Sequence, residues 1–166
     1  SPATADPAEI FARVADKHRG MAIGLAYSVA GAPPDIMVSG KTHRRGVPVA
    51  QDARWHIGSI TKSMTAALAL SLIEEGTLGL DAPLGDVFFT PPSSDVWQAA
   101  TLRTALSHTA GLPTAFDRPV VEGATTGDGP RDRIDRLASM WDADPAPAVT
   151  GLAYSNAGYV YAGSAM

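Results

Sequence analysis

The chain has 166 residues, of which 45% are hydrophobic and 18% are charged, and its formal net charge is −4. That composition predicts a globular chain with a buried core and excludes a disordered one. Basic residues never cluster beyond Arg44 and Arg45, and no apolar run reaches the roughly 18 residues of a membrane-spanning helix, so we expect no nucleic-acid partner and no membrane span.

Apolar periodicity and turn residues predict short strands followed by helices. Asp6 is an N-cap residue in front of Pro7, which suits the first position of a helix, and Gly-Ala-Pro-Pro at 31–34 predicts the turn of a hairpin. In chain order we expect a helix at 7–18, strands at 22–29, 35–41 and 47–49, helices at 61–75 and 101–107, a loop at 116–130, a helix at 131–141 and a last helix from 157 onward.

The segment 61–75 gives the strongest helix prediction. Its apolar side chains, from Met64 to Ile73, point in nearly every direction around a helix, and Gly76 ends it. A helix without a polar face is typically buried inside a domain. We therefore expect this helix to be buried.

The predicted strands do not complete a sheet. They open the chain, and helices dominate everything that follows. An isolated two-stranded hairpin is marginally stable, and an exposed sheet edge invites pairing with another chain. We expect one α+β domain over 1–166 that is incomplete in this chain, with the hairpin and the apolar helix in 1–80 and a mostly helical region in 81–166.

The chain has no cysteine, which excludes disulfides and cysteine-based metal sites. Its four histidines, at positions 18, 43, 56 and 108, lack the spacing of metal ligands. The opening Ser-Pro-Ala-Thr-Ala-Asp-Pro is typical of a mature N-terminus after signal-peptide removal, although a cloning boundary fits it equally well. From it we expect a periplasmic or secreted protein of bacterial type.

A serine and a lysine one helical turn apart begin the apolar helix. The i, i+3 spacing places Ser59 and Lys62 on one face, and the helix N-terminus favours negative charge near the serine oxygen. A serine hydroxyl is a weak nucleophile until a base takes its proton. Lys62 can act as that base, or as a positive charge that keeps another base deprotonated. The alternative is an N-capping serine beside a solvated lysine, but Gly58 indicates a strand-to-helix turn that exposes a nucleophile on a rigid element.

A second motif, Tyr154-Ser155-Asn156, lies near the end of the chain. In an extended segment, residues i and i+2 point the same way. A Tyr154 phenol near Lys62 can relay a proton, and the Asn156 amide can orient the lysine or a substrate amide. The alternative for this tripeptide alone is a turn with a core tyrosine.

Three longer runs carry a family resemblance. They are Trp-His-Ile-Gly-Ser-Ile-Thr-Lys at 55–62, Leu-Ser-His-Thr-Ala-Gly-Leu-Pro at 106–113 and Tyr-Ser-Asn-Ala-Gly-Tyr at 154–159. In this order and spacing they resemble the class C β-lactamase and penicillin-binding-protein-like serine hydrolases, which include D-alanyl-D-alanine carboxypeptidases, D-aminopeptidases and esterases. The run at 74–83 fits the same family, and the resemblance covers most of the chain from about residue 22 onward.

The resemblance implies a β-lactamase/transpeptidase-like fold, in which helices flank an antiparallel sheet beside a helical region, and it implies no metal or organic cofactor. It makes Ser59 the acylated nucleophile, Lys62 its partner and Tyr154 the general base. It places Asn156 in substrate binding and lysine positioning, and His108 in a signature with a structural role. The remaining histidines receive no catalytic role: His56 is expected beside the nucleophile turn, and His18 and His43 at the surface.

Two features depart from the family pattern. Val149 replaces the glycine that usually precedes Thr150, so we expect that turn to differ. The family also has a Lys- or His-Thr-Gly triad on a later strand, which supplies the second oxyanion donor, and these 166 residues do not contain it. The run Lys-Thr-His at 41–43 lies before Ser59 and lacks the glycine. The chain therefore corresponds to roughly the first half of a family domain.

The sequence predicts a serine hydrolase that forms an acyl-enzyme on an amide, β-lactam or ester carbonyl, of the β-lactamase, D-Ala-D-Ala carboxypeptidase or esterase type. Its partner is then a small-molecule or peptide substrate. One alternative is a non-catalytic member that binds peptidoglycan-like peptides, and the intact Ser59, Lys62 and Tyr154 argue against it. The other is an inert fragment that needs a second polypeptide to complete its sheet.

Overall fold

The structure is a computed structural model that describes residues 6–88, 91–114 and 151–166. The expected loop at 116–130, the expected helix at 131–141 and the substituted turn at 149–150 lie outside these residues. The chain divides into two compact units, up to residue 56 and from residue 57 onward, and each is described by itself.

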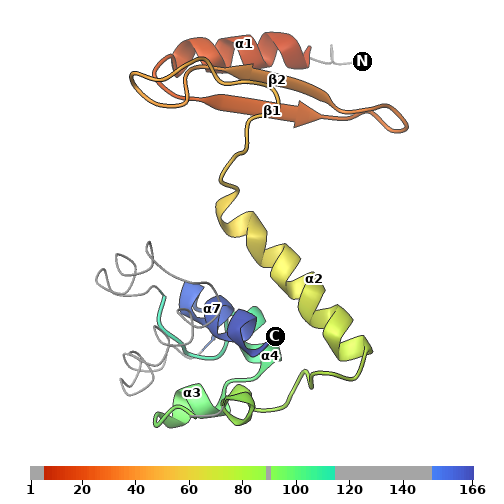
Figure 1. The fold of residues 1–166 in the computed structure, drawn as a ribbon, viewed down its shortest axis with the longest axis vertical. Coiled ribbons are helices and arrows are strands. Elements are labelled where there is room, and N and C mark those ends of the chain that lie inside the picture. Colours follow the sequence, from red (N-terminus) through yellow and green to blue (C-terminus); the bar gives the residue numbers. More distant parts are fainter. Residues whose placement is uncertain (1–5, 89–90, 115–150) are drawn as a thin grey trace. The chain divides into compact units, whose positions relative to one another are not determined.

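The first unit begins with α1 (Pro7–Lys17), which lies along a two-stranded sheet (Figure 1). The Asp6 carboxylate accepts a hydrogen bond from the Ala8 N–H at 2.9 Å, and a proline occupies the first turn. The predicted N-cap is therefore confirmed. The helix ends one residue earlier than expected because His18 is its C-cap.

The sheet of the first unit is the predicted hairpin. Strand β1 (Ile23–Tyr27) pairs antiparallel with β2 (Asp35–Ser39), and both are shorter than the expected runs. The expected strand at 47–49 is wrong: only an isolated bridge joins Lys41 to Pro48. Hydrogen bonds from the Thr42 N–H to the Val47 carbonyl and from the Val49 N–H to the Gly40 carbonyl flank this bridge, both at 3.0 Å, and no ladder extends from it.

The core of the second unit is built on α3 (Asp95–Ala99), α4 (Leu102–Leu106) and α7 (Asn156–Ala165). Trp97 and Tyr161 are both 0% exposed and form its centre. Their rings meet edge to face at 5.2 Å, and the Tyr161 hydroxyl donates to the Trp97 carbonyl at 2.9 Å. This contact ties α7, at the end of the chain, to α3 (Figure 1).

The predicted helices at 101–107 and from 157 onward are confirmed as α4 and α7. Thr101 caps α4 through a reciprocal pair of hydrogen bonds with Thr104, which satisfies two otherwise unpaired N–H groups. The sequence prediction missed α3 and the 3-10 turn η2 (Leu84–Val87). Neither is long enough to show a helical apolar repeat.

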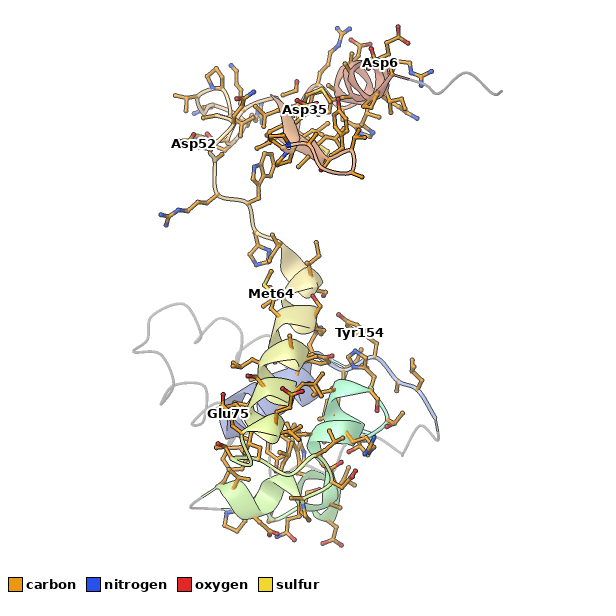
Figure 2. All side chains as sticks on the ribbon, turned by 90° about the vertical axis from the view of Figure 1, so that its right-hand side faces the viewer. Asp6, Asp35, Asp52, Met64, Glu75 and Tyr154 are labelled. Atoms are coloured by element: carbon orange, nitrogen blue, oxygen red, sulfur yellow. The ribbon has the colours of Figure 1, made fainter. Side chains whose placement is uncertain are left out.

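The apolar helix α2 (Thr61–Glu74) has the expected extent but not the expected surroundings. Ala69 is its only buried residue, so the prediction of a buried helix is wrong for this structure. Of the described α-helices of its own unit, α7 packs against it. Among the described residues, no helix is long and apolar enough to cross a membrane. The side chains of α2 that are more than half exposed include Met64, Leu68 and Leu70 (Met64 is labelled in Figure 2).

Replacing a core leucine tests this packing. Leu102 is 0% exposed and Leu152 is 75% exposed. We expect Leu102→Ala to lower the free energy of unfolding by about 2–5 kcal/mol, because it removes buried contacts and leaves a cavity. We expect Leu152→Ala to change it by less than about 0.5 kcal/mol. Denaturant unfolding of both variants measures the difference, and equal losses would contradict the assignment of the core.

Candidate active site

Ser59 lies in the 3-10 turn η1 (Gly58–Ile60), which runs directly into α2. The residue before it, Gly58, has a φ of +54°, and a Cβ there would meet nothing within 4 Å. The glycine is thus favoured for its left-handed backbone and not for lack of space. Residues 53–57 form no strand, so the expected strand-to-helix turn is an irregular segment entering a helix. Ser59 itself is exposed.

Two polar groups converge on the Ser59 hydroxyl. The Tyr154 hydroxyl lies 2.7 Å from Ser59 Oγ and donates to it, and Lys62 Nζ donates to the same oxygen at 3.4 Å. Figure 2 shows Tyr154 beside α2. A hydroxyl can also accept a hydrogen bond, so the same contact can run from Ser59 to Tyr154 once the phenol has lost its proton. The geometry therefore allows a proton to pass between Ser59 and Tyr154.

Lys62 is held by an amide and by two aromatic rings. Its Nζ donates to Asn156 Oδ1 at 2.7 Å. The same nitrogen lies 4.9 Å from the centroid of the Tyr154 ring and 5.4 Å from that of Tyr159. Contacts of this kind between a cation and a ring face are attractive. All four residues predicted from the sequence, Ser59, Lys62, Tyr154 and Asn156, thus meet at one place.

Ser155 connects this site to α7, although its role was not predicted. Its hydroxyl accepts the Gly158 N–H at 2.8 Å, as an N-cap does, and donates to the Pro113 carbonyl at 2.6 Å. The next N–H, that of Asn156, donates to the Thr114 carbonyl at 2.9 Å. The segment that carries Tyr154 and Asn156 is therefore fixed at the start of a helix.

His108 contacts the site, which sequence reasoning did not foresee. Its Nδ1 accepts the Ser155 N–H at 3.0 Å. Its ring centroid lies 4.5 Å from that of Tyr154 and 5.1 Å from that of Tyr159. Burial, and then the nearby Lys62 charge, lower the pKa of His108 below its ordinary value. The one indication of this role in the sequence is that His108 lies in the run at 106–113, which carries the family resemblance.

The hydrogen bond to Lys62 lowers the pKa of the Tyr154 hydroxyl below its ordinary value, the contact with Ser59 adds to this, and burial opposes both. The neighbouring Tyr159 behaves in the opposite way, because burial and the nearby Tyr154 raise its pKa. Its hydroxyl donates to the Leu106 carbonyl at 2.9 Å. Tyr154 is thus the tyrosine of this pair that is tuned to lose its proton. Within the described parts of the chain, no group of His, Asp and Glu side chains could hold a metal ion.

Removing the lysine charge tests this tuning. We expect Lys62→Met to raise the pKa of Tyr154 toward the ordinary tyrosine value of about 10, because a neighbouring cation stabilises the phenolate. The measurement is an ultraviolet titration of tyrosine ionisation. Its matched control is the same titration of Tyr154→Phe, which isolates the contribution of Tyr154. An unchanged Tyr154 titration in Lys62→Met would contradict the assigned cause.

The sequence is similar to that of known proteins. The family model described as Beta-lactamase matches residues 12–166. Penicillin-binding protein 4 of Amycolatopsis lactamdurans is 31% identical over 163 residues, which cover 93% of this chain and 40% of that protein. The chain thus spans well under half the length of this relative.

Solved structures agree on the fold. The D-amino acid amidase of Ochrobactrum anthropi SV3, complexed with D-phenylalanine, superposes with a TM-score of 0.71 at 26% identity, over 95% of this chain and 43% of that one. A class C beta lactamase from Rhodobacter sphaeroides gives a TM-score of 0.66 at 24% identity, over 95% and 43%. The predicted β-lactamase/transpeptidase-like fold is confirmed, truncated relative to the full fold.

Proposed function

The chain belongs to the beta-lactamase family, and on that premise we propose that its protein is a serine hydrolase that forms an acyl-enzyme at Ser59. The observation that carries the proposal is the 2.7 Å contact between Tyr154 Oη and Ser59 Oγ, with Lys62 Nζ beside the same oxygen. A nucleophile, a tunable acid–base group and a cation within one hydrogen-bond network are what acyl transfer requires.

In the proposed reaction Tyr154 is the general base. Its phenolate takes the Ser59 proton as Oγ attacks the substrate carbonyl carbon, and the electron pair of the C=O bond moves to the oxygen. The Ser59 N–H supplies one donor to that oxyanion. When the tetrahedral intermediate collapses, the bond to the leaving group breaks and Tyr154 returns the proton to the leaving nitrogen or oxygen. Water then attacks the acyl-Ser59 ester by the same route.

Lys62 and Asn156 support this cycle. Lys62 stabilises the phenolate of Tyr154 and so lowers the pKa of its hydroxyl, which makes the base available at a lower pH than for an ordinary tyrosine. Asn156 holds Lys62 through Oδ1, and its amide nitrogen is the group we assign to the substrate carbonyl. Tyr154 and Asn156, two residues apart, contact different partners. The Tyr154 side chain contacts the nucleophile Ser59, and the Asn156 side chain contacts Lys62.

The proposed substrate is an amide, a β-lactam or an ester. An amidase and a beta lactamase among the structural neighbours support the first two. Carboxypeptidase or esterase action, and a periplasmic or secreted location, stay predictions. The two-stranded sheet and the exposed side of α2 favour one alternative, an incomplete unit that becomes active only when further polypeptide completes the sheet.

The direct test is the intact mass of the protein after incubation with a penicillin-type β-lactam and, separately, with an activated acyl ester. We expect one acyl group to be added, and to map to the peptide that contains Ser59. Ser59→Ala should abolish the adduct. We expect Tyr154→Phe to slow its formation by about 10²–10⁴-fold, the usual contribution of a general base.

Ser63→Ala is the matched control. Ser63 lies on the same helix, and its hydroxyl donates to the Ile60 carbonyl at 2.7 Å and not to Ser59, Lys62 or Tyr154. This variant should be acylated at the wild-type rate. An adduct that persists in Ser59→Ala, or no adduct with either acyl donor, would contradict the proposal for this chain.

A further inference from the structure

We propose that His108, with an unprotonated Nδ1, is a positioning residue that fixes Tyr154 and Asn156 by clamping the backbone on either side of Tyr154, and that protonation of its ring releases this clamp. The inference rests on the proposed function for its kinetic consequence. Its structural part concerns only the described residues and can be tested without catalysis.

The clamp consists of two hydrogen bonds from the residues on either side of Tyr154. The Ala153 N–H donates to the His108 carbonyl at 2.8 Å, and the Ser155 N–H donates to His108 Nδ1 at 3.0 Å. One residue therefore holds the backbone N–H groups of both neighbours of the proposed base. The His108 ring also packs on the Tyr154 ring, with centroids 4.5 Å apart and planes 34° apart. Backbone and phenol of Tyr154 are thus oriented by the same partner.

The backbone of His108 is itself unusual. Its φ is +61°, and it is the one described residue other than glycine with a positive φ. Such a conformation is uncommon for a side chain with a Cβ and persists only where its surroundings enforce it. Here it allows the carbonyl and the side chain of one residue to face the same strand-like segment. The strained residue is therefore one that contacts the proposed site.

The clamp requires a particular protonation state. Nδ1 can accept the Ser155 N–H only while it carries no proton, so the ring must be neutral with its proton on Nε2. Among residues 6–88, 91–114 and 151–166, the charged and titratable groups that face the ring are Lys62 of α2, Tyr154, and Tyr159 of α7. Burial and the Lys62 charge both disfavour the imidazolium and lower the pKa of His108, which keeps the clamp closed at neutral pH.

Acid should open the clamp. A proton added to Nδ1 would place two donors, that N–H and the Ser155 N–H, against each other, and would set a second cation beside Lys62. Since the lowered pKa of His108 lies below the ordinary value of about 6.5, the clamp is complete above that pH and is lost as the pH falls through the lowered value. Protonation of His108 then adds its own inflection to the acid limb of Ser59 acylation, besides that of the base Tyr154.

Two substitutions separate positioning from mere packing. His108→Asn keeps an acceptor near the position of Nδ1, tolerates a positive φ and does not titrate. His108→Leu removes the acceptor. We expect His108→Asn to retain the wild-type acylation rate at neutral pH within about threefold. We expect its pH profile to lack the inflection that His108 contributes. We expect Leu to lower the rate by about tenfold, the cost of one hydrogen bond.

A second readout needs no activity. In the wild-type protein, the NMR shift of the Ser155 amide should titrate together with the His108 ring, with an inflection below pH 6.5. In His108→Asn this titration should vanish. The matched control is His18→Asn, which changes an exposed histidine at the end of α1 and should leave both the Ser155 titration and the acid limb unchanged.

The outcomes separate the two proposals. An acid limb in His108→Asn identical to that of the wild type, or a Ser155 amide that ignores the ionisation of His108, would overturn the inference. If His108→Leu does not fold, His108→Asn alone decides. If no acyl donor reacts with any variant, including the wild type, the proposed function fails, and the Ser155 titration still decides whether His108 forms the clamp.

Discussion

The hydrogen bond between Lys62 Nζ and Asn156 Oδ1 is the contact on which the site depends. It joins the first turn of α2 to the first residue of α7, across 94 positions of the chain, at a distance of 2.7 Å. In the described parts of the chain, no carboxylate forms a salt bridge with Lys62. An amide oxygen and two ring faces hold the lysine without cancelling its charge, so that charge remains available to the Tyr154 hydroxyl.

The rest of the second unit keeps the two sides of this contact in place. Tyr161 anchors α7 on Trp97 in the core, and the Ser155 hydroxyl caps the same helix. His108 accepts hydrogen bonds from the backbone N–H groups of Ala153 and Ser155, the two neighbours of Tyr154. The nucleophile lies on a helical turn, while its base lies on a short segment tied by backbone hydrogen bonds. Such support places reactive groups more accurately than free loops can.

The sequence predicted local features well because local chemistry determines them. Asp6 before Pro7 specified a helix start, and Ser59 with Lys62 specified one face of a helical turn. The Tyr-x-Asn spacing placed two side chains on one side of an extended segment. Tertiary packing determines what was missed. The exposure of α2 depends on which elements cover it, and the role of His108 depends on a partner 47 positions away.

The interruption at 47–49 shows a further limit. Apolar residues there predicted a strand, but only an isolated bridge between Lys41 and Pro48 forms. The helix α3 was missed for a different reason. Its five residues are too few to show a helical apolar repeat, and the burial of Trp97 stabilises it.

The central claim is that Lys62 acts through Tyr154, and a double-mutant cycle on the rate of Ser59 acylation tests it most directly. The cycle compares Lys62→Met, Tyr154→Phe and the double variant with the wild type. If the two groups work as one unit, the double variant will be about as slow as the slower single variant. Losses that multiply would show that the lysine and the tyrosine act independently, and would contradict the claim.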